Sequence, residues 1–147
     1  MAEGSDKISA IEKVEIENAI KAAEQKTSGE IQVHIDNRCK EDVLDRAAFV
    51  FKTLKMHETK ERNGVLFYVA IKDHKFAILG DAGINQKVET GFWDSIRDSV
   101  ISKFKENKYG EGLSEGILMA GEKLSTHFPY QDDDENELSD EISFGKD

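Results

Sequence analysis

Arg62-Asn63-Gly64-Val65-Leu66-Phe67-Tyr68-Val69-Ala70-Ile71 contains seven consecutive apolar residues, most of them β-branched or aromatic, after an Asn-Gly turn signal. The run ends at the polar segment Lys72–Lys75. An apolar run of this length, bounded by turn residues, is typical of a strand that is covered on both faces. The segment therefore predicts the central strand of a sheet, around which the rest of the chain can be arranged.

A helix and a second strand are predicted before this segment. Ser9 and Glu12 form a capping-box pattern, and helical spacing of apolar residues continues to about Lys26. In the segment Glu30–Asp36, apolar and polar residues alternate strictly, with His34 on the polar side. Alternation of this kind predicts a strand with one wet or partly covered face, and therefore an edge strand.

The connections on either side of the central segment define the direction of its neighbours. A helix that starts at Asp42 and continues to about Leu54 separates the two predicted strands, which are therefore expected to be parallel. The short polar turn at Lys72–Lys75 leads into the apolar segment Phe76–Leu79, and so short a connection requires an antiparallel hairpin.

Two further helices complete the predicted domain. Apolar residues at helical spacing run from Trp93 to Phe104 and again from Leu113 to Phe128, with a break at Lys108–Gly112. Pro129 stops the last helix. The fold class is α/β: a three-layer α/β/α sandwich with a small mixed β-sheet, formed by one domain at residues 8–130.

Charge is distributed unevenly along the 147 residues, whose formal net charge is −10. Residues 131–147 contain eight acidic residues and one lysine, so this acidic tail carries −7 and residues 1–130 carry −3. The nearly balanced body argues against a nucleic-acid partner, which requires a basic face. The tail has too few apolar residues for a core of its own and is expected to be flexible, although Leu138, Ile142 and Phe144 could dock on a partner or fold back on the body.

The cysteine count and the distribution of apolar residues are the sequence features that bear on cellular location. Cys39 is the single cysteine, which excludes an intrachain disulfide and fits a reducing compartment. No segment has the roughly 20 apolar residues of a membrane span, and the first residues do not resemble a signal peptide. We therefore expect a cytoplasmic protein without a membrane span.

The predicted topology brings three polar, glycine-containing segments to one end of the sheet. The two parallel strands begin there, and the antiparallel strand ends there. The segments supply two carboxylates, an amide and a hydroxyl, all hard oxygen ligands suited to Ca²⁺ or Mg²⁺: Glu30, Asp81, Asn63 and Ser28. Arg62 and Glu61 precede Asn63 in sequence and either support these ligands from outside or pair elsewhere.

Two alternatives to this metal site remain open. In the first, the glycines simply form turns and Asp81 caps the following helix, so that the segments have only a structural role. In the second, a site lies at the opposite end, at Asp36–Arg38 and at Asp73–His74, because the carboxyl ends of parallel strands are a common place for binding. We rank this end second, because the tight hairpin at Asp73 leaves little room for a crevice.

The chain resembles the TPM domain family over about residues 8–128, and stand-alone bacterial members in particular. Four segments carry the resemblance, in this order: Thr27-Ser28-Gly29-Glu30-Ile31, Arg62-Asn63-Gly64-Val65-Leu66, the Gly80–Gly83 turn, and Tyr109-Gly110-Glu111-Gly112-Leu113. Many relatives have Gly-x-Gly-x-Glu in the turn, whereas this chain has Asp81 and Asn85 in another arrangement. The resemblance implies an α/β/α sandwich and divalent-cation binding in an acidic crevice. It also implies a link to acid phosphatase activity, which has been attributed to plant members.

Two functional hypotheses follow. In the first, the chain is a binding or accessory module in which Ca²⁺ or Mg²⁺ orders the convergent loops, and these loops or the acidic tail meet a protein partner. This hypothesis is favoured because the sequence shows no evident pair of base and nucleophile. In the second, the chain is a metal-dependent phosphatase, with Glu30 or Asp81 holding the metal and Arg62 steadying the phosphate.

Overall fold

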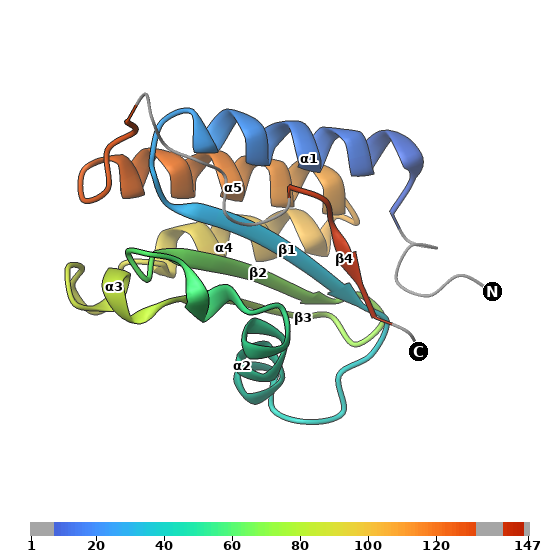
Figure 1. Ribbon diagram of the computed structural model, residues 1–147. Helices are drawn as coiled ribbons and strands as arrows, with labels where there is room; N and C mark the ends of the chain where they lie inside the picture. The colour runs from blue at the N-terminus through green and yellow to red at the C-terminus, as the bar shows by residue number, and fades with distance from the viewer. Residues whose placement is uncertain (1–7, 132–139, 146–147) are drawn as a thin grey trace.

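The computed structural model describes residues 8–131 and 140–145. Four strands, five α-helices and a short 3₁₀ segment, η2, make up the described part (Figure 1). In chain order they are α1 (Ala10–Glu24), β1 (Glu30–Asp36), α2 (Val43–Thr53), η2 (Met56–Glu58), β2 (Gly64–Ala70), β3 (Lys75–Gly80), α3 (Ala82–Asn85), α4 (Asp94–Lys105), α5 (Tyr109–Ser125) and β4 (Ser143–Phe144).

The strands form one mixed sheet in the order β3-β2-β1-β4. β1 is parallel to β2, with Glu30 opposite Gly64, and β2 is antiparallel to β3, with Val65 opposite Gly80. All seven residues of β2 are buried. The predicted central strand, its parallel neighbour and the antiparallel hairpin are therefore confirmed.

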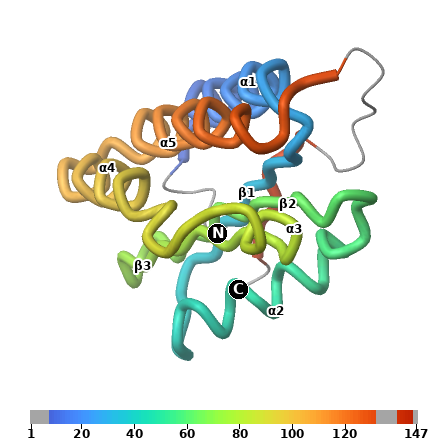
Figure 2. Tube along the Cα trace, turned by 90° about the vertical axis from the view of Figure 1, so that its left-hand side faces the viewer, coloured from blue at the N-terminus to red at the C-terminus, as the bar shows by residue number. Residues whose placement is uncertain are grey.

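Helices cover both faces of the sheet, which confirms the α/β fold class. Figure 2 shows α1, α4 and α5 on one face and α2 on the other. The alternation of β2 divides its side chains between two cores, because successive residues point to opposite faces. Val65, Phe67 and Val69 pack with α1, α4 and α5, whereas Leu66 and Tyr68 pack with α2.

The prediction that Glu30–Asp36 is an edge strand with a wet face is wrong. β4 pairs in parallel with the outer side of β1, placing Ser143 opposite His34. The polar side of β1 is buried as well: His34 is 6% exposed and Asp36 is 1% exposed. These polar groups are tolerated in the interior because they bond to one another and to neighbouring elements, as described below.

Two helix boundaries also differ from the prediction. The short helix α3 precedes α4 and was not foreseen as a separate element, although its N-cap, Asp81, was considered as a helix cap. The predicted break at Lys108–Gly112 is instead the first turn of α5. Glycine is needed there, because a Cβ on Gly110 would lie 2.7 Å from Cγ of Glu12 in α1. The Gly110 amide also donates to the Glu12 carboxylate at 3.0 Å.

The described part of the acidic tail folds back on the body. Ile142 is 9% exposed and belongs to the core on the α1 side, and Phe144 packs against that core. The Gly145 amide donates to the Ile35 carbonyl at 2.9 Å. Of the two alternatives for the apolar tail residues, folding back is confirmed for Ile142 and Phe144, whereas Leu138 lies outside the described residues.

Candidate functional site

The three segments predicted to converge do meet at one end of the sheet. The Glu30 amide donates to the Asn63 carbonyl at 3.2 Å, and the Asn63 side-chain amide donates to the Ser28 carbonyl at 3.2 Å. The Asp81 amide donates to the Gly64 carbonyl at 3.0 Å. Backbone pairing therefore holds the starts of β1 and β2 beside the end of β3, as the predicted strand directions require.

The Asp81 carboxylate is bound by Arg62. The Arg62 Nε donates to Asp81 Oδ2 at 2.7 Å and Nη2 donates to Oδ1 at 2.9 Å, a two-point ion pair. The hydrogen bond to Asp81 raises the pKa of the Arg62 guanidinium. Asp81 Oδ1 also accepts from the Ala82 amide at 2.7 Å at the start of α3. Asp81 thus has the capping role that was considered as an alternative, and a charge partner in addition.

The turn that carries Asp81 is packed directly on the segment before β2. The Gly83 amide donates to the Arg62 carbonyl at 2.9 Å. A Cβ on Gly83 would lie 2.1 Å from the Glu61 carbonyl oxygen, so no larger residue fits without a backbone shift. Arg62 itself has a φ of 52°, in the left-handed region. This close contact places the Arg62 side chain over Asp81.

The other three predicted ligands lie in the same region but differ in exposure. Asn63 is 2% exposed and Glu30 is 4% exposed. Ser28 is half-buried, and its hydroxyl donates to the Glu61 carboxylate at 3.4 Å. The structure therefore brings together the loops that carry Glu30, Asp81, Asn63 and Ser28.

Sequence analysis missed two acidic residues beside Glu30. The Glu24 carboxylate, at the end of α1, accepts from the Ile31 amide at 3.0 Å. Burial and a hydrogen bond shared with Asp140 raise the pKa of Glu24 to about 9, and the Glu30 charge acts in the same direction. Glu24 was detectable only as an acid six residues before Glu30, and Asp140 gave no local signal. Three carboxyl groups from α1, β1 and the tail are thus crowded together.

Within the described residues, the acidic side chains do not form a compact metal-binding cluster. Among residues 8–131 and 140–145, no group of three or more His, Cys, Asp or Glu side chains is arranged to hold a metal ion. Asp81 is held by Arg62, and Glu24 bonds to the start of β1. The donor set is that of a hard-cation site, but its members are engaged with protein groups.

The opposite end of the sheet contains a buried polar network centred on Asp36. The His34 Nε2 lies 2.9 Å from Asp36 Oδ1, and the Arg46 Nε donates to Asp36 Oδ2 at 3.0 Å. The Tyr68 hydroxyl donates to the same Oδ2 at 2.5 Å. Burial acts to raise the pKa of Asp36, but hydrogen bonds from His34, Tyr68 and Arg46 lower it to about 2. Asp36 is therefore a carboxylate at all ordinary pH values.

A cavity of about 810 Å³ adjoins this network. It lies between the end of β1, α2 and β4, and His34 and Ser143 contribute to its lining. The expectation of little room at this end is therefore wrong, because the space lies beside β4 and not at the Asp73 hairpin. The Asp73 carboxylate instead accepts from the Cys39 amide at 2.7 Å and from Arg38 at 3.3 Å.

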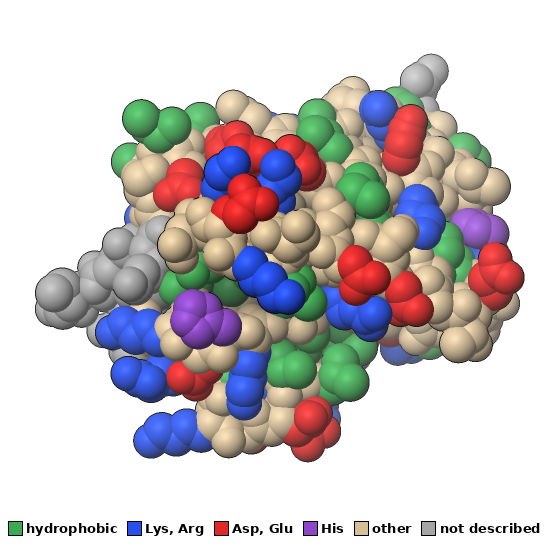
Figure 3. Space-filling model, turned by 180° about the vertical axis from the view of Figure 1, so that it is seen from behind, with side chains coloured by type: hydrophobic (Ala, Val, Ile, Leu, Met, Phe, Trp, Pro, Cys, Tyr) green, Lys and Arg blue, Asp and Glu red, His purple; other side chains and the backbone are tan. Residues whose placement is uncertain are grey.

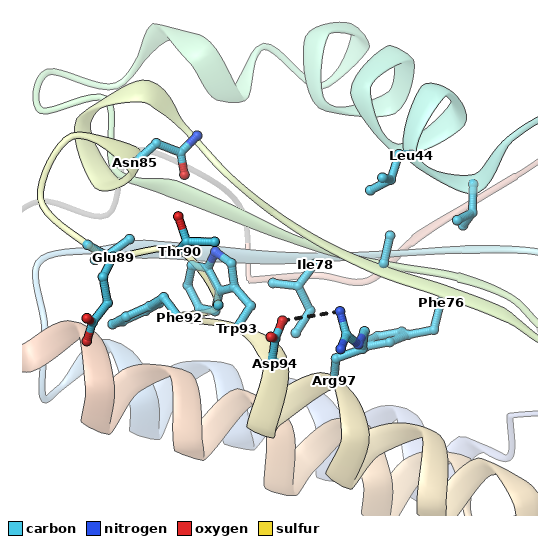
Figure 4. Close-up of a pocket in the computed structure, with 14 residues that line it drawn as sticks. Leu44, Phe76, Ile78, Asn85, Glu89, Thr90, Phe92, Trp93, Asp94 and Arg97 are labelled. Carbon is cyan, nitrogen blue, oxygen red and sulfur yellow. Dashed lines mark ion pairs between the residues drawn. The ribbon is translucent and has the colours of Figure 1, made fainter.

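A second hollow, of about 510 Å³, runs beside β3 (Figure 4). Phe76 and Ile78 of β3 line it together with Phe92 and Trp93. Asp94 and Arg97 of α4 form an ion pair there at 3.3 Å. None of the four predicted metal ligands contributes to its lining. It is thus separate from the convergent loops.

Charged side chains of both signs are mixed on the face seen from behind. Figure 3 shows Lys and Arg interspersed with Asp and Glu there, with hydrophobic side chains between them. This agrees with the small net charge of −3 on residues 1–130.

Comparison with known proteins identifies the family. The family model for the TPM domain matches residues 3–123, most of the chain. The chain belongs to the TPM domain family. No match is found among the curated proteins. The resemblance inferred from the four sequence segments is thus confirmed, and three of these segments form the convergent end of this TPM domain.

Solved structures with the same fold come from bacteria. The solution structure of the BA42 protein from the psychrophilic bacterium Bizionia argentinensis is 46% identical, with a TM-score of 0.89, covering 94% of this chain and 95% of that one. The N-terminal domain of a P. gingivalis protein is 20% identical, with a TM-score of 0.67, covering 82% of this chain and 78% of that one. The N-terminal domain of a Corynebacterium glutamicum protein is 11% identical, with a TM-score of 0.60, covering 95% of this chain and 81% of that one. The last two show the fold alone.

The helices were also compared with the requirements of a membrane span. Within the described part of this TPM domain, no helix combines the length and the apolar character that crossing a bilayer requires.

Proposed function

We propose that this TPM domain is a binding or accessory module that takes up Ca²⁺ or Mg²⁺ at the convergent end of the sheet. Glu30 is the principal ligand, with oxygens of Asn63 and Ser28 beside it and Asp81 at the edge of the site. The cation orders the loops before β1 and β2, and the ordered surface or the acidic tail meets a protein partner. The observation that carries the proposal is the crowding of carboxyl groups around Glu30.

Carboxyl groups crowded in buried and half-buried positions are unfavourable when ionised, because burial and mutual repulsion both disfavour charge. The repulsion is reduced in the folded protein because Glu24 stays protonated at neutral pH, with its pKa at about 9. A divalent cation would relieve the same repulsion and supply the missing positive charge. Cation binding is then linked to release of the Glu24 proton.

Asp81 enters the site only if Arg62 releases it, because the guanidinium now binds both carboxylate oxygens. Arg62 is therefore a built-in competitor of the cation. Its side chain is 50% exposed, so it can turn outward into solvent without a change in the fold. In this proposal, Arg62 sets the affinity of the site.

The test is calorimetric titration of the chelator-treated protein with Ca²⁺ and with Mg²⁺, followed by amide NMR shifts. We expect shifts at residues 28–30 and 63–64, and at pH 7 a release of close to one proton per cation, measured in two buffers of different ionisation enthalpy. Glu30→Gln should weaken binding about tenfold or more, which is about 1.4 kcal/mol. Glu15→Gln, at an exposed position of α1, is the matched control. Unchanged affinity in Glu30→Gln would remove Glu30 from the site.

The phosphatase hypothesis has weaker support. In that hypothesis Arg62 binds the phosphate and Asp81 is one of two candidate metal ligands. In the structure the Arg62 Nε donates to Asp81 Oδ2 at 2.7 Å, so both residues are occupied by each other. Release of phosphate from p-nitrophenyl phosphate, dependent on added Mg²⁺ and lost in Asp81→Asn, would restore this hypothesis.

A further inference from the structure

Ser143, His34 and Asp36 form a continuous hydrogen-bonded chain at the carboxyl end of β1. The Ser143 Oγ lies 2.9 Å from His34 Nδ1, and His34 Nε2 lies 2.9 Å from Asp36 Oδ1. The strand pairing fixes this arrangement, because β4 places Ser143 directly opposite His34. A hydroxyl, an imidazole and a carboxylate in this order are the components of nucleophilic catalysis by serine.

The surroundings of Asp36 determine which nitrogen of His34 carries the proton. Arg46 and Tyr68 both donate to Asp36 Oδ2, which leaves Oδ1 for His34. Since the ionised Asp36 carboxylate can only accept, the His34 Nε2 must donate to it. In the neutral imidazole, Nδ1 is then an acceptor and takes the hydrogen bond from the Ser143 hydroxyl. His34 is thus oriented as a base toward Ser143.

The imidazole ring is also held in place from the side. The rings of His34 and Tyr68 are stacked, with centroids 5.9 Å apart and an angle of 9° between their planes. Tyr68 therefore contacts His34 and its partner Asp36 at the same time. The tautomer and the plane of the base are therefore both fixed.

The cavity of about 810 Å³ gives this serine access to a small molecule. Ser143 and His34 contribute to its lining, and so do the apolar side chains of Phe49, Leu54 and Phe144. Phe49 is 60% exposed, so apolar surface is available at the mouth. The basic residues Arg38, Lys40 and Arg46 line the same cavity together with one acidic residue, Glu41, so positive charge is in excess there. The lining thus offers room for an apolar chain and a positive rim for an anion.

We propose that Ser143 is the nucleophile of an ester-hydrolysing site whose base is His34, oriented by Asp36, with the 810 Å³ cavity taking esters of an apolar acyl group and an anionic alcohol. Ser143 Oγ attacks the acyl carbonyl while its proton moves to His34 Nδ1. The bond to the alcohol oxygen breaks, and His34 returns the proton to that oxygen. Water then attacks the acyl-serine, giving one proton to His34, and Ser143 leaves with that proton as the carboxylic acid is released.

This site is independent of the proposed cation site, because it lies at the other end of β1 and uses none of the four predicted metal ligands. Ser143 also lies outside residues 3–123, which the TPM domain model matches. The ring nitrogens of His34 have the reverse of their most frequent roles, in which Nε2 faces the serine. The chemical requirement, a hydrogen-bonded base fixed by a carboxylate, is nevertheless met.

The experiment is labelling of the full chain with a fluorophosphonate probe, with the labelled residue located by peptide mass spectrometry. We expect a covalent adduct on Ser143, complete loss in Ser143→Ala, and labelling about 100-fold slower in His34→Gln, the effect of losing a general base. Ser102→Ala, at an exposed position of α4, is the control and should label like the wild type. Amide NMR spectra establish that each variant is folded.

Hydrolysis tests the substrate class separately. The butyryl ester of 4-hydroxybenzoate should show a KM several-fold lower than the butyryl ester of methyl 4-hydroxybenzoate, and Lys40→Ala should remove the difference. Equal KM values would overturn the anionic preference. Absence of labelling in the wild-type protein, or labelling retained in folded Ser143→Ala, would overturn the site itself. If His34→Gln misfolds, the labelling rate of the wild-type protein is measured as a function of pH instead. A rate that follows the titration of a single group supports the role of the base, and a rate that does not contradicts it.

Discussion

Arg62 and Asp81 are joined by two hydrogen bonds, of 2.7 and 2.9 Å, across the gap between the start of β2 and the end of β3. The pair therefore links two of the three segments that meet at this end of the TPM domain. It also neutralises a carboxylate that would otherwise face the proposed cation site. Stability and cation affinity are thus expected to respond to Arg62 in opposite directions.

Arg62→Gln should raise the affinity for Ca²⁺ or Mg²⁺ several-fold, because Asp81 is then available to the cation. The same change should lower the free energy of unfolding only slightly, since half of the Arg62 side chain is exposed to solvent and water screens the ion pair. Calorimetric titration and urea unfolding measure the two effects. A fall in cation affinity would show that Arg62 does not compete for Asp81.

Asp81→Ala should cost more stability than Arg62→Gln, because it removes the cap of α3 together with the ion pair. Loss of an N-cap costs about 0.5–2 kcal/mol. Urea unfolding of both single variants and the double variant measures the coupling between the two side chains. Equal destabilisation in the two single variants would mean that the cap contributes nothing.

The ends of the strands could be predicted from sequence, but the bonds between their side chains could not. The alternation in Glu30–Asp36 and the apolar run in Val65–Ile71 defined two strands. The helical crossover between them and the short hairpin after them gave the strand directions, which was enough to bring Glu30, Asn63 and Asp81 to one end. The pairing of Asp81 with Arg62 depends on the left-handed backbone of Arg62 and on the close packing of Gly83 against the Glu61 and Arg62 carbonyls. The spacing of residues in the sequence does not predict either feature.

The second polar cluster was missed for a different reason. No local pattern indicated that Ser143, 109 residues after His34, would pair with it. β4 has only two residues in an acidic segment, so neither length nor hydrophobicity marks it as a strand. When β4 is not predicted, His34 is assigned to a solvent-exposed face of the sheet. His34 and Ser143 are then not recognised as a pair of base and nucleophile.

Glu24 makes the stability of this TPM domain depend on pH. Its pKa is about 9 in the folded protein and near 4.5 when unperturbed, so between these values the folded state holds a proton that the unfolded state has lost. Stability contributed by this group is therefore present below about pH 4.5 and declines as pH rises toward 9. Glu24→Gln should remove the decline and raise the free energy of unfolding at pH 8 by at least about 1 kcal/mol.

Urea unfolding at several pH values between 5 and 9 tests this role of Glu24. Glu15→Gln, on the exposed side of the same helix, is the control for loss of one carboxylate. A wild-type protein whose stability rises over this range, with Glu24→Gln following the same curve, would contradict the protonated state of Glu24.

Asp36 has the opposite effect, because its pKa is lowered from 3.8 to about 2 in the folded protein. Its stabilising contribution is present above about pH 4 and is lost as pH falls through 2, and a shift of this size corresponds to about 2 kcal/mol. Asp36→Asn should destabilise by about 3–5 kcal/mol at pH 7, since it leaves the Arg46 charge without its partner. Asp98→Asn, at an exposed position, should change little. Acid unfolding of the three proteins measures the difference.

Ile142 tests whether the tail contributes to the folded body in solution. Its side chain is 9% exposed and packs in the core beneath α1, and its amide donates to the Glu17 carboxylate at 3.2 Å. Truncation of a buried isoleucine removes apolar burial and leaves a cavity, so Ile142→Ala should lower the free energy of unfolding by about 2–4 kcal/mol. Leu118→Ala, at a position that is 40% exposed, is the matched control and should cost less. Because β4 also positions Ser143, loss of the Ile142 anchor should slow fluorophosphonate labelling while the body remains folded. An Ile142→Ala variant as stable as the wild type would show that β4 is not held against β1 in solution.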